Sequence, residues 1–181
     1  MEDARKLIYR EMQLEEAEQI REIDATWHIR NAWRWNTSTG AYELQEMNWT
    51  EYELPNGFDW HLNRCRETIR SGGKAFGCFE GDRLVGYVTL NAEIFGIHEK
   101  YVLLDQLFIS EEHRNQGIGK ELVSMCKRQA ALFGAEKIYL CSASAEDTIA
   151  FYKKLGCKAA TERNEELFAE DPNDIQLELA V

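Results

Sequence analysis

The sequence predicts an α/β fold with a mixed, mostly antiparallel central sheet. Short apolar runs suited to strands alternate along the chain with stretches of helical spacing. Two of these runs flank Glu80-Gly81-Asp82-Arg83, which is a hairpin turn signal. A strand, a loop, a helix and a further strand then follow one another in the middle of the chain, a pattern typical of α/β domains.

One strand and two helices are expected in the first third of the chain. The strand covers residues 6–11, and a helix follows because apolar residues recur at near-helical spacing at Leu14, Ala17, Ile20 and Ile23. Residues 27–60 are rich in aromatic residues but lack a regular pattern, so most of this stretch is expected to be irregular. The second helix covers residues 58–69 and ends at Ser71-Gly72-Gly73.

Three strands are expected in the centre of the chain. Residues 74–79 and 84–90 form the predicted hairpin. Residues 101–109 are almost continuously apolar, which is typical of a central strand covered on both faces. Asp105 and Gln106 are the only polar residues of this strand.

The last third continues the alternation of helices and strands. Gly134 is a suitable C-cap for the helix that precedes it, and Ser144-x-x-Asp147 is a capping-box pattern for a helix that Gly156 ends. The other elements expected here are a helix at residues 117–133 and strands at 137–141, 157–160 and 175–181. The total is about seven strands flanked by about four helices.

Length and charge limit the classes of function. At 181 residues the chain has the length of one domain, covering residues 1–181. The net charge of −11 argues against a nucleic-acid partner, because phosphate binding needs a basic surface. The charge either favours a cationic small molecule or only keeps the protein in solution. The sequence shows neither a signal peptide nor the roughly 18 apolar residues that span a membrane, so we expect a cytoplasmic protein without a membrane partner.

The cysteines do not suggest a metal site. They are odd in number, widely spaced and without a C-x-x-C pair: Cys65, Cys78, Cys126, Cys141 and Cys157. We therefore expect no metal and no disulfide framework, and we expect most of these cysteines to be small buried hydrophobic residues.

The most informative segment runs from Leu107 to Lys120 and reads LFISEEHRNQGIGK. A buried strand leads there through a short loop into a helix that starts with Gly117 and Gly119. The first amides of a helix lack intrahelical partners, and the helix dipole adds about half a positive charge at that end. Glycine lets the backbone approach an anion closely, and Arg114 and Lys120 add formal positive charge. The segment therefore predicts a phosphate-binding site.

Two common phosphate-binding loops do not fit this segment. A nucleoside triphosphate loop requires Gly-Lys-Ser/Thr at its end, whereas Gly119-Lys120 is followed by Glu121 and the glycine spacing is too short. A dinucleotide-binding fold requires G-x-G-x-x-G, which the R-x-x-G-x-G spacing does not match.

Arg114-x-x-Gly117-x-Gly119, directly after a buried strand, resembles the acyl-CoA signature of the GNAT superfamily of N-acetyltransferases. The later segment FYKKLGC, residues 151–157, is similar to the family's second marker, in which a tyrosine stands four residues before a glycine and a phenylalanine usually follows. Cys157 replaces that phenylalanine. Ala145 replaces the usual asparagine seven residues before the tyrosine, with Ser144 as the nearest substitute. The match covers residues 74–160, and the order of elements fits the whole chain.

The resemblance implies a GNAT-like sheet and an acetyl-CoA cosubstrate, with no metal. It implies direct transfer of the acetyl group to the primary amine of a small, cationic molecule. The residues implied in binding the CoA pyrophosphate and pantetheine arm form one stretch: Leu107, Phe108, Ile109, Arg114, Asn115, Gln116, Gly117, Ile118, Gly119 and Lys120. A backbone N–H near residues 107–109 would polarise the acetyl carbonyl.

Two residues are candidates for the proton transfers. Only about one lysine-like amine in 2,500 is neutral at pH 7, so a base or a water wire is useful. Asp105 is the candidate base, because an apolar setting tunes a carboxyl group for proton transfer. The family's glutamate on this strand maps to Leu103, however, and a hydrogen-bonded Asp105 without a catalytic role fits equally well. The resemblance implies that Tyr152 is the general acid for the CoA sulfur, with a core aromatic as the alternative.

Other interpretations stay open. A covalent route through Cys141 is less favoured, because no histidine is an obvious activating partner in the sequence. The five tryptophans lie in one third of the chain, together with several acidic residues: Trp27, Trp33, Trp35, Trp49 and Trp60. This composition suits either an acceptor site that binds an ammonium group or an insertion that packs on the core or on a second copy. A homodimer, a protein or peptide acetyltransferase, and a CoA-binding regulatory domain without turnover are the remaining alternatives.

Overall fold

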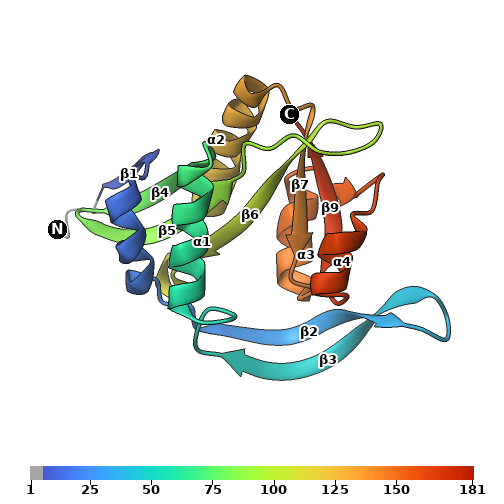
Figure 1. Cartoon of the computed structure of the whole chain (residues 1–181). Coiled ribbons are helices and arrows are strands. Elements are labelled where there is room, and N and C mark those ends of the chain that lie inside the picture. The colour runs from blue at the N-terminus through green and yellow to red at the C-terminus, as the bar shows by residue number, and fades with distance from the viewer. Residues whose placement is uncertain (1–5) are drawn as a thin grey trace.

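A seven-stranded sheet forms the centre of the computed structural model, which describes residues 6–181 (Figure 1). The strand order is β1-β4-β5-β6-β7-β9-β8, and every neighbouring pair is antiparallel except β6–β7. The strands are Leu7–Glu11 (β1), Lys74–Glu80 (β4), Arg83–Leu90 (β5), Tyr101–Ile109 (β6), Lys137–Ser142 (β7), Lys158–Ala159 (β8) and Ile175–Ala180 (β9). The predicted mixed, mostly antiparallel sheet is confirmed. Residues 1–5, on which part of the signal-peptide expectation depends, lie outside the described residues.

Helices cover both faces of this sheet. The 3₁₀ helix η1 (Leu14–Glu22) and helix α1 (Phe58–Arg70) pack on one face, in an apolar cluster that includes Tyr87. Helices α2 (Ile118–Phe133) and α3 (Glu146–Lys154) pack on the other, in a larger cluster that includes Val88. Tyr87 and Val88 are neighbours in β5, and successive side chains of a strand point to opposite faces, so the sheet separates the two clusters.

The expectation of an irregular stretch after residue 27 was wrong. Trp27–Asn36 (β2) and Ala41–Glu51 (β3) form a two-stranded antiparallel hairpin outside the main sheet. Most of its side chains are partly or fully exposed. Strands of this kind lack the alternation that one-sided burial imposes on a sequence, and this explains why the pattern was not visible. The short helix α4 (Glu165–Glu170) was also not predicted, because its six residues cover less than two helical turns.

The predicted capping box before α3 was also wrong. The N-cap is Ala145, and the Ser144 hydroxyl instead accepts a hydrogen bond from Arg34 Nη1 at 2.5 Å. Asp147 Oδ2 accepts a hydrogen bond from the indole N–H of Trp27 at 3.0 Å. The backbone N–H of Trp33 adds a 2.8 Å bond to the Ser144 carbonyl. These polar groups therefore fasten the β2–β3 hairpin to the start of α3.

Strands β6 and β7 separate after a short paired stretch. Their register covers three residues of β6, Tyr101 to Leu103, opposite the first three of β7. A shift in the β5–β6 register follows, at Leu90↔Leu104 and Thr89↔Gln106, and it leaves Asp105 as the extra residue. A bulge of this kind bends the strand that carries it, so β6 turns away from β7 here. Figure 1 shows the two strands converging at one end and diverging towards the hairpin.

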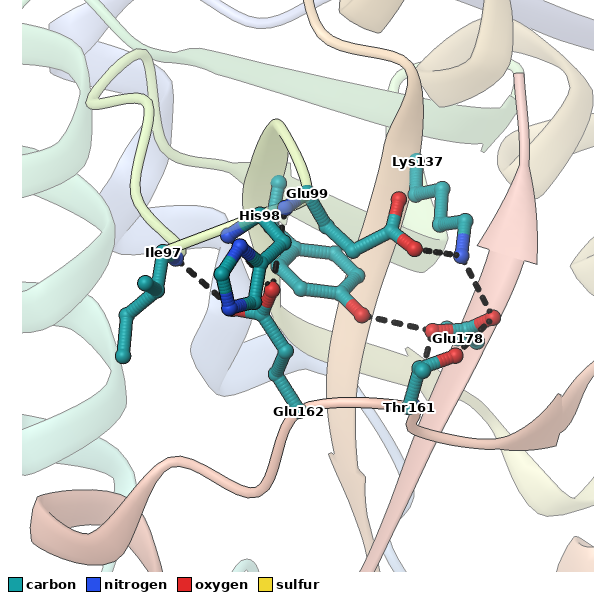
Figure 2. Close-up of polar contacts among 8 residues, drawn as sticks. Ile97, His98, Glu99, Lys137, Thr161, Glu162 and Glu178 are labelled. Carbon is teal, nitrogen blue, oxygen red and sulfur yellow. Dashed lines mark hydrogen bonds and ion pairs between the residues drawn. The ribbon is translucent and has the colours of Figure 1, made fainter.

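A polar network holds the converging ends of β6, β7 and β9 together (Figure 2). Glu178 on β9 accepts hydrogen bonds from the Tyr101 hydroxyl at 2.6 Å and from Lys137 Nζ at 2.8 Å. The backbone N–H of Thr161 donates to the same carboxylate at 2.9 Å. Burial alone would raise the pKa of Glu178, but these hydrogen bonds outweigh it and lower the pKa to about 2. The network therefore joins the three strands at the end where β6 and β7 remain paired.

A second carboxylate fixes the loop that leads into β6. Glu162 accepts hydrogen bonds from three successive backbone N–H groups, those of Ile97, His98 and Glu99, at 2.7, 2.6 and 3.0 Å (Figure 2). These bonds lower the pKa of Glu162, with the one from Ile97 as the largest cause. The loop before β6 is thus anchored to the segment that follows β8.

Candidate active site

The loop between β6 and α2 presents the start of a helix to solvent. Asn115 and Gly117 have left-handed backbone conformations, with φ of 61° and 85°. Residues 115–117 and Lys120 are exposed, whereas Ile118 and Gly119 are buried. Because α2 is 16 residues long, its first amides carry the dipole of a full helix. Of the predicted phosphate-binding residues, Asn115, Gln116, Gly117 and Lys120 therefore lie on one exposed turn.

Arg114 shapes this turn from inside. Its guanidinium donates hydrogen bonds to the carbonyls of Ile109 at 3.0 Å and Thr26 at 2.6 Å. Arg114 therefore ties the end of β6 to the segment that enters β2, and the free positive side chain of the motif is the exposed Lys120. The Gln116 side chain adds a 2.9 Å hydrogen bond to the Glu112 carbonyl, which closes the turn on itself.

Gly119 is required for close packing, and Gly119→Ala is expected to weaken acetyl-CoA binding about tenfold. A Cβ at this position would lie 2.9 Å from Phe151 Cζ and 3.1 Å from Ile109 Cδ1. Either these two side chains or the start of helix α2 would have to shift, and a shift of α2 would move its first amides. Isothermal titration calorimetry with acetyl-CoA measures the change. Adding Phe151→Leu should restore part of the affinity, and unchanged binding in Gly119→Ala would contradict the prediction.

The exposed edge of β6 continues the site. From Leu104 onwards β6 has no partner on its β7 side, while its other side pairs with β5. Leu107, Phe108 and Ile109 lie on this open edge and are partly buried. An open strand edge offers backbone N–H and C=O groups to an extended ligand. Such an edge suits the amide-containing pantetheine arm and a backbone donor for the acetyl carbonyl.

Tyr152 lies on α3 and is 7% exposed. Its ring contacts that of Phe151 edge to face, with ring centroids 5.0 Å apart. Within residues 6–181, no hydrogen bond is present at its hydroxyl group. Burial raises the pKa of Tyr152, and the thiols of Cys157 and Cys126 and the charge of Asp174 raise it further. The hydroxyl is therefore protonated at neutral pH, as a general acid must be.

Asp105 is held in an ion pair with Arg64 of α1. Both of its carboxylate oxygens accept hydrogen bonds, from Arg64 Nε at 2.6 Å and from Arg64 Nη2 at 2.7 Å. The Asp105 side chain is 7% exposed and the Arg64 side chain 33%. Forked pairs of this kind are strong and fix geometry. The pair therefore fastens α1 to β6 at the bulge. Arg64 was not identified from the sequence, since it resembles the other charged residues on that helix.

A pocket of about 250 Å³ lies between the β2–β3 hairpin and the end of β7. Residues 143–145 form one wall, and Trp27, Arg34 and Glu51 belong to the hairpin side. Asp171 and Asp174, from the loop before β9, complete the lining. The lining thus contains one arginine and three carboxylates, which favours a cationic occupant. A second hollow of about 320 Å³ is lined by α1 alone, at Trp60, Asn63, Arg64 and Glu67.

Cys141 lies on the β7 side of the opening between β6 and β7. Burial, followed by the charges of Asp174, Glu170 and Asp105, raises the pKa of its thiol to about 12. A thiol that holds its proton this firmly is a poor nucleophile, so the environment opposes the covalent alternative. The other cysteines are buried free thiols, which confirms the expectation that most of them are packing residues.

The tryptophans do not form a single cage. Trp27 lines the pocket beside the hairpin, and Trp60 lies under Arg64, with its ring centroid 4.8 Å from the guanidinium carbon. Trp33 packs against the core, and Trp35 and Trp49 are 42% and 57% exposed. An acceptor cage built from all five tryptophans therefore does not match the structure.

These features together define a site for acyl-CoA-dependent N-acetyl transfer, and comparison with known proteins gives the same class. The chain belongs to the acetyltransferase (GNAT) family, whose sequence model matches residues 32–157. No curated protein sequence matches the chain significantly. Among solved structures, nourseothricin acetyltransferase has a TM-score of 0.71 at 17% identity, covering 96% of this chain and 98% of that one.

Two further structures are similar over nearly their whole length. A candidate streptothricin acetyltransferase from Bacillus anthracis strain Ames, solved with acetyl coenzyme A, has a TM-score of 0.68 at 16% identity, with 97% and 100% of the chains covered. The PaiA N-acetyltransferase from Thermoplasma acidophilum, solved with coenzyme A, has a TM-score of 0.63 at 18% identity, with 97% and 99% covered. At these identities the likeness establishes the shared fold.

Residues 6–181 contain neither a cluster of metal ligands nor a membrane-spanning helix. Among residues 6–181, no group of three or more His, Cys, Asp or Glu side chains is arranged to hold a metal ion. In the same part of the chain, no helix is long and apolar enough to cross a membrane.

Proposed function

We propose that this protein transfers the acetyl group of acetyl-CoA directly to a primary amine on a small, cationic molecule. The observation that carries the proposal is the pocket beside the open end of β6 and β7, which is small and has more carboxylates than cationic groups in its lining. Its volume of about 250 Å³ is just below the range typical of drug-sized ligands, which suits a small amine or one arm of a larger one. The whole chain, residues 1–181, is proposed to act as one domain.

The proposed mechanism assigns the cosubstrate to the loop and the strand edge. The backbone amides of residues 115–117 and of the first turn of α2, with Lys120, would hold the CoA pyrophosphate, and Arg114 would keep the loop in shape. The edge formed by residues 107–109 would pair with the pantetheine arm and supply a backbone N–H to the carbonyl oxygen. The amine nitrogen then bonds to the carbonyl carbon, the carbon–sulfur bond breaks, and Tyr152 protonates the departing sulfur.

Asp105 has a positioning role in this proposal. Both of its carboxylate oxygens accept hydrogen bonds from Arg64 of α1, so neither oxygen is available to take a proton from the amine. Asp105→Asn and Arg64→Gln are each expected to lower kcat/KM by a similar factor, about tenfold, because the two residues act as one unit. A large loss in Asp105→Asn alone, with near-normal activity in Arg64→Gln, would instead identify Asp105 as the base. Melting temperatures of both variants separate misfolding from loss of activity.

A thiol-release assay with acetyl-CoA tests the proposed function. The panel contains spermidine, an aminoglycoside, streptothricin, free lysine and a basic peptide. Release stimulated by one or more of the small amines supports the proposal, and release with the peptide alone identifies a peptide acetyltransferase. Tight acetyl-CoA binding without release for any member would contradict the proposal and favour a regulatory domain.

The position of the β2–β3 hairpin favours a small amine over a peptide as the acceptor. Its backbone bond from Trp33 to Ser144 and its side-chain bonds to Ser144 and Asp147 hold it across the end of β7. An extended peptide needs an open groove at this point, whereas a small amine needs only the pocket. A protein acceptor would require these bonds to open.

A further inference from the structure

Asp174 lines the pocket, and its charge also acts on Tyr152 at the proposed reaction centre. It lines the pocket between the hairpin and β7, and it is half-buried. Its charge acts on the Cys141 thiol on β7 and on the Tyr152 hydroxyl on α3. Asp174 therefore lies within electrostatic range of the residue that we assign to the leaving sulfur, and also of the strand that borders the opening.

The Asp174 carboxylate is free to accept a proton. Within residues 6–181, no hydrogen bond or ion pair engages its side-chain oxygens; its bonds are made by the backbone, which accepts from the Tyr42 hydroxyl at 3.4 Å and donates to the Asp171 carbonyl at 3.1 Å. Asp105, in contrast, has both oxygens on Arg64. A base must reach the proton that it removes, and a free carboxylate on a pocket wall meets that condition.

We propose that Asp174 binds the ammonium group of the acceptor and takes its proton, and that it is therefore the general base of the reaction. This inference depends on the proposed function. The amine nitrogen loses two protons in all. One is balanced by the proton that Tyr152 gives to the CoA sulfur, and the other leaves to solvent through Asp174. The nitrogen–carbon bond forms and the carbon–sulfur bond breaks, so the products are the acetamide, the free thiol and one proton.

The electrostatic setting of Asp174 agrees with this role. Burial, followed by the charge of Asp171, raises the pKa of Asp174 to about 6. A base works best when its pKa is near the working pH, because it is then ionised and still basic enough to hold the proton. The other groups that face it come from β2, β3, β7 and α3, and are Arg34, Tyr42, Glu51, Cys141 and Tyr152.

The test is the pH dependence of kcat/KM with the best amine of the panel, for Asp174→Asn and wild type. We expect a loss of about tenfold or more at pH 7. The loss should shrink as the pH rises towards 10, because the neutral fraction of the amine then grows about tenfold per pH unit and no base is needed. The acid limb near pH 6 should disappear in Asp174→Asn and return in Asp174→Glu. Asp171→Asn should move that limb to lower pH, because it removes a charge that raises the pKa of Asp174.

Controls separate this inference from the proposed function. Asp82→Asn, on the β4–β5 turn, should behave as wild type. Wild-type turnover combined with an unchanged pH profile in Asp174→Asn would overturn the role of Asp174 and leave the proposed function standing. A higher KM at every pH, without recovery at high pH, would reduce Asp174 to a charge for binding and would also overturn the base assignment. Failure of every amine with the wild type would reject the proposed function itself, and the inference with it.

Discussion

Tyr152→Phe is expected to lower kcat about a hundredfold while leaving acetyl-CoA affinity within about twofold. The hydroxyl lies on a buried ring and has no hydrogen-bond partner in the described part of the chain, so its removal leaves no orphaned group behind. The raised pKa of Tyr152 keeps its hydroxyl protonated at neutral pH, so a proton is in place for the departing sulfur. Stopped-flow measurement of thiol release and calorimetric titration with acetyl-CoA provide the two values.

Tyr139→Phe is the matched control for Tyr152→Phe. Tyr139 is buried like Tyr152, but its hydroxyl donates to Gln176 and accepts from the backbone N–H of Asn164 at 2.9 Å. We expect that variant to lose stability, about 1–2 kcal/mol for the broken network, with little change in kcat. Equal kcat values for wild type and Tyr152→Phe would remove Tyr152 from the mechanism without affecting the assignment of the enzyme class.

The sequence predicted best those elements that the core buries. The limits of β6 agree with the prediction because a strand covered on both faces is apolar throughout and ends where burial ends. The start of α2 was also predicted to within a residue, since Gly117 and Gly134 mark its two ends. The hairpin β2–β3 was missed, because it projects from the sheet and its side chains follow no single buried face.

The parts of the site that depend on tertiary contacts could not be predicted. Asp174 lies in a polar stretch without periodicity, 22 residues after Tyr152, and only the return of β9 alongside β7 brings it to the pocket. The partner of Asp105 is Arg64, 41 residues earlier on a helix with several other charged residues. Arg114 was correctly placed in the loop, but its two carbonyl bonds depend on the position of Thr26, which no local pattern reveals.

The converging end of β6 and β7 should contribute to the stability of the fold, and Glu178→Gln is expected to cost about 2 kcal/mol of unfolding free energy at pH 7, because hydrogen bonds to a charged group are replaced by weaker ones. Glu178 is 8% exposed and its carboxylate accepts hydrogen bonds from Lys137, Tyr101 and Thr161, so the change weakens all three of these bonds. Lys137 keeps its ion pair with Glu99 at 2.9 Å. Glu136→Gln is the matched control, because Glu136 pairs with Lys100 at the surface with both side chains about 60% exposed. That variant should change stability by about 0.5 kcal/mol or less.

Lowering the pH should abolish the difference in unfolding free energy between Glu178→Gln and wild type. The pKa of Glu178 is about 2 in the folded protein and 4.5 in the reference state, so its contribution is complete above pH 4.5 and is lost as the pH falls towards 2. Urea unfolding at pH 7 and at pH 3 measures this, with a smaller gap expected at the lower pH. A loss of unfolding free energy that is equal at both pH values, or as small as that of Glu136→Gln, would show that the network is dispensable. If the network is required, the variant should also bind acetyl-CoA less tightly, because the angle between β6 and β7 would no longer be fixed at its closed end.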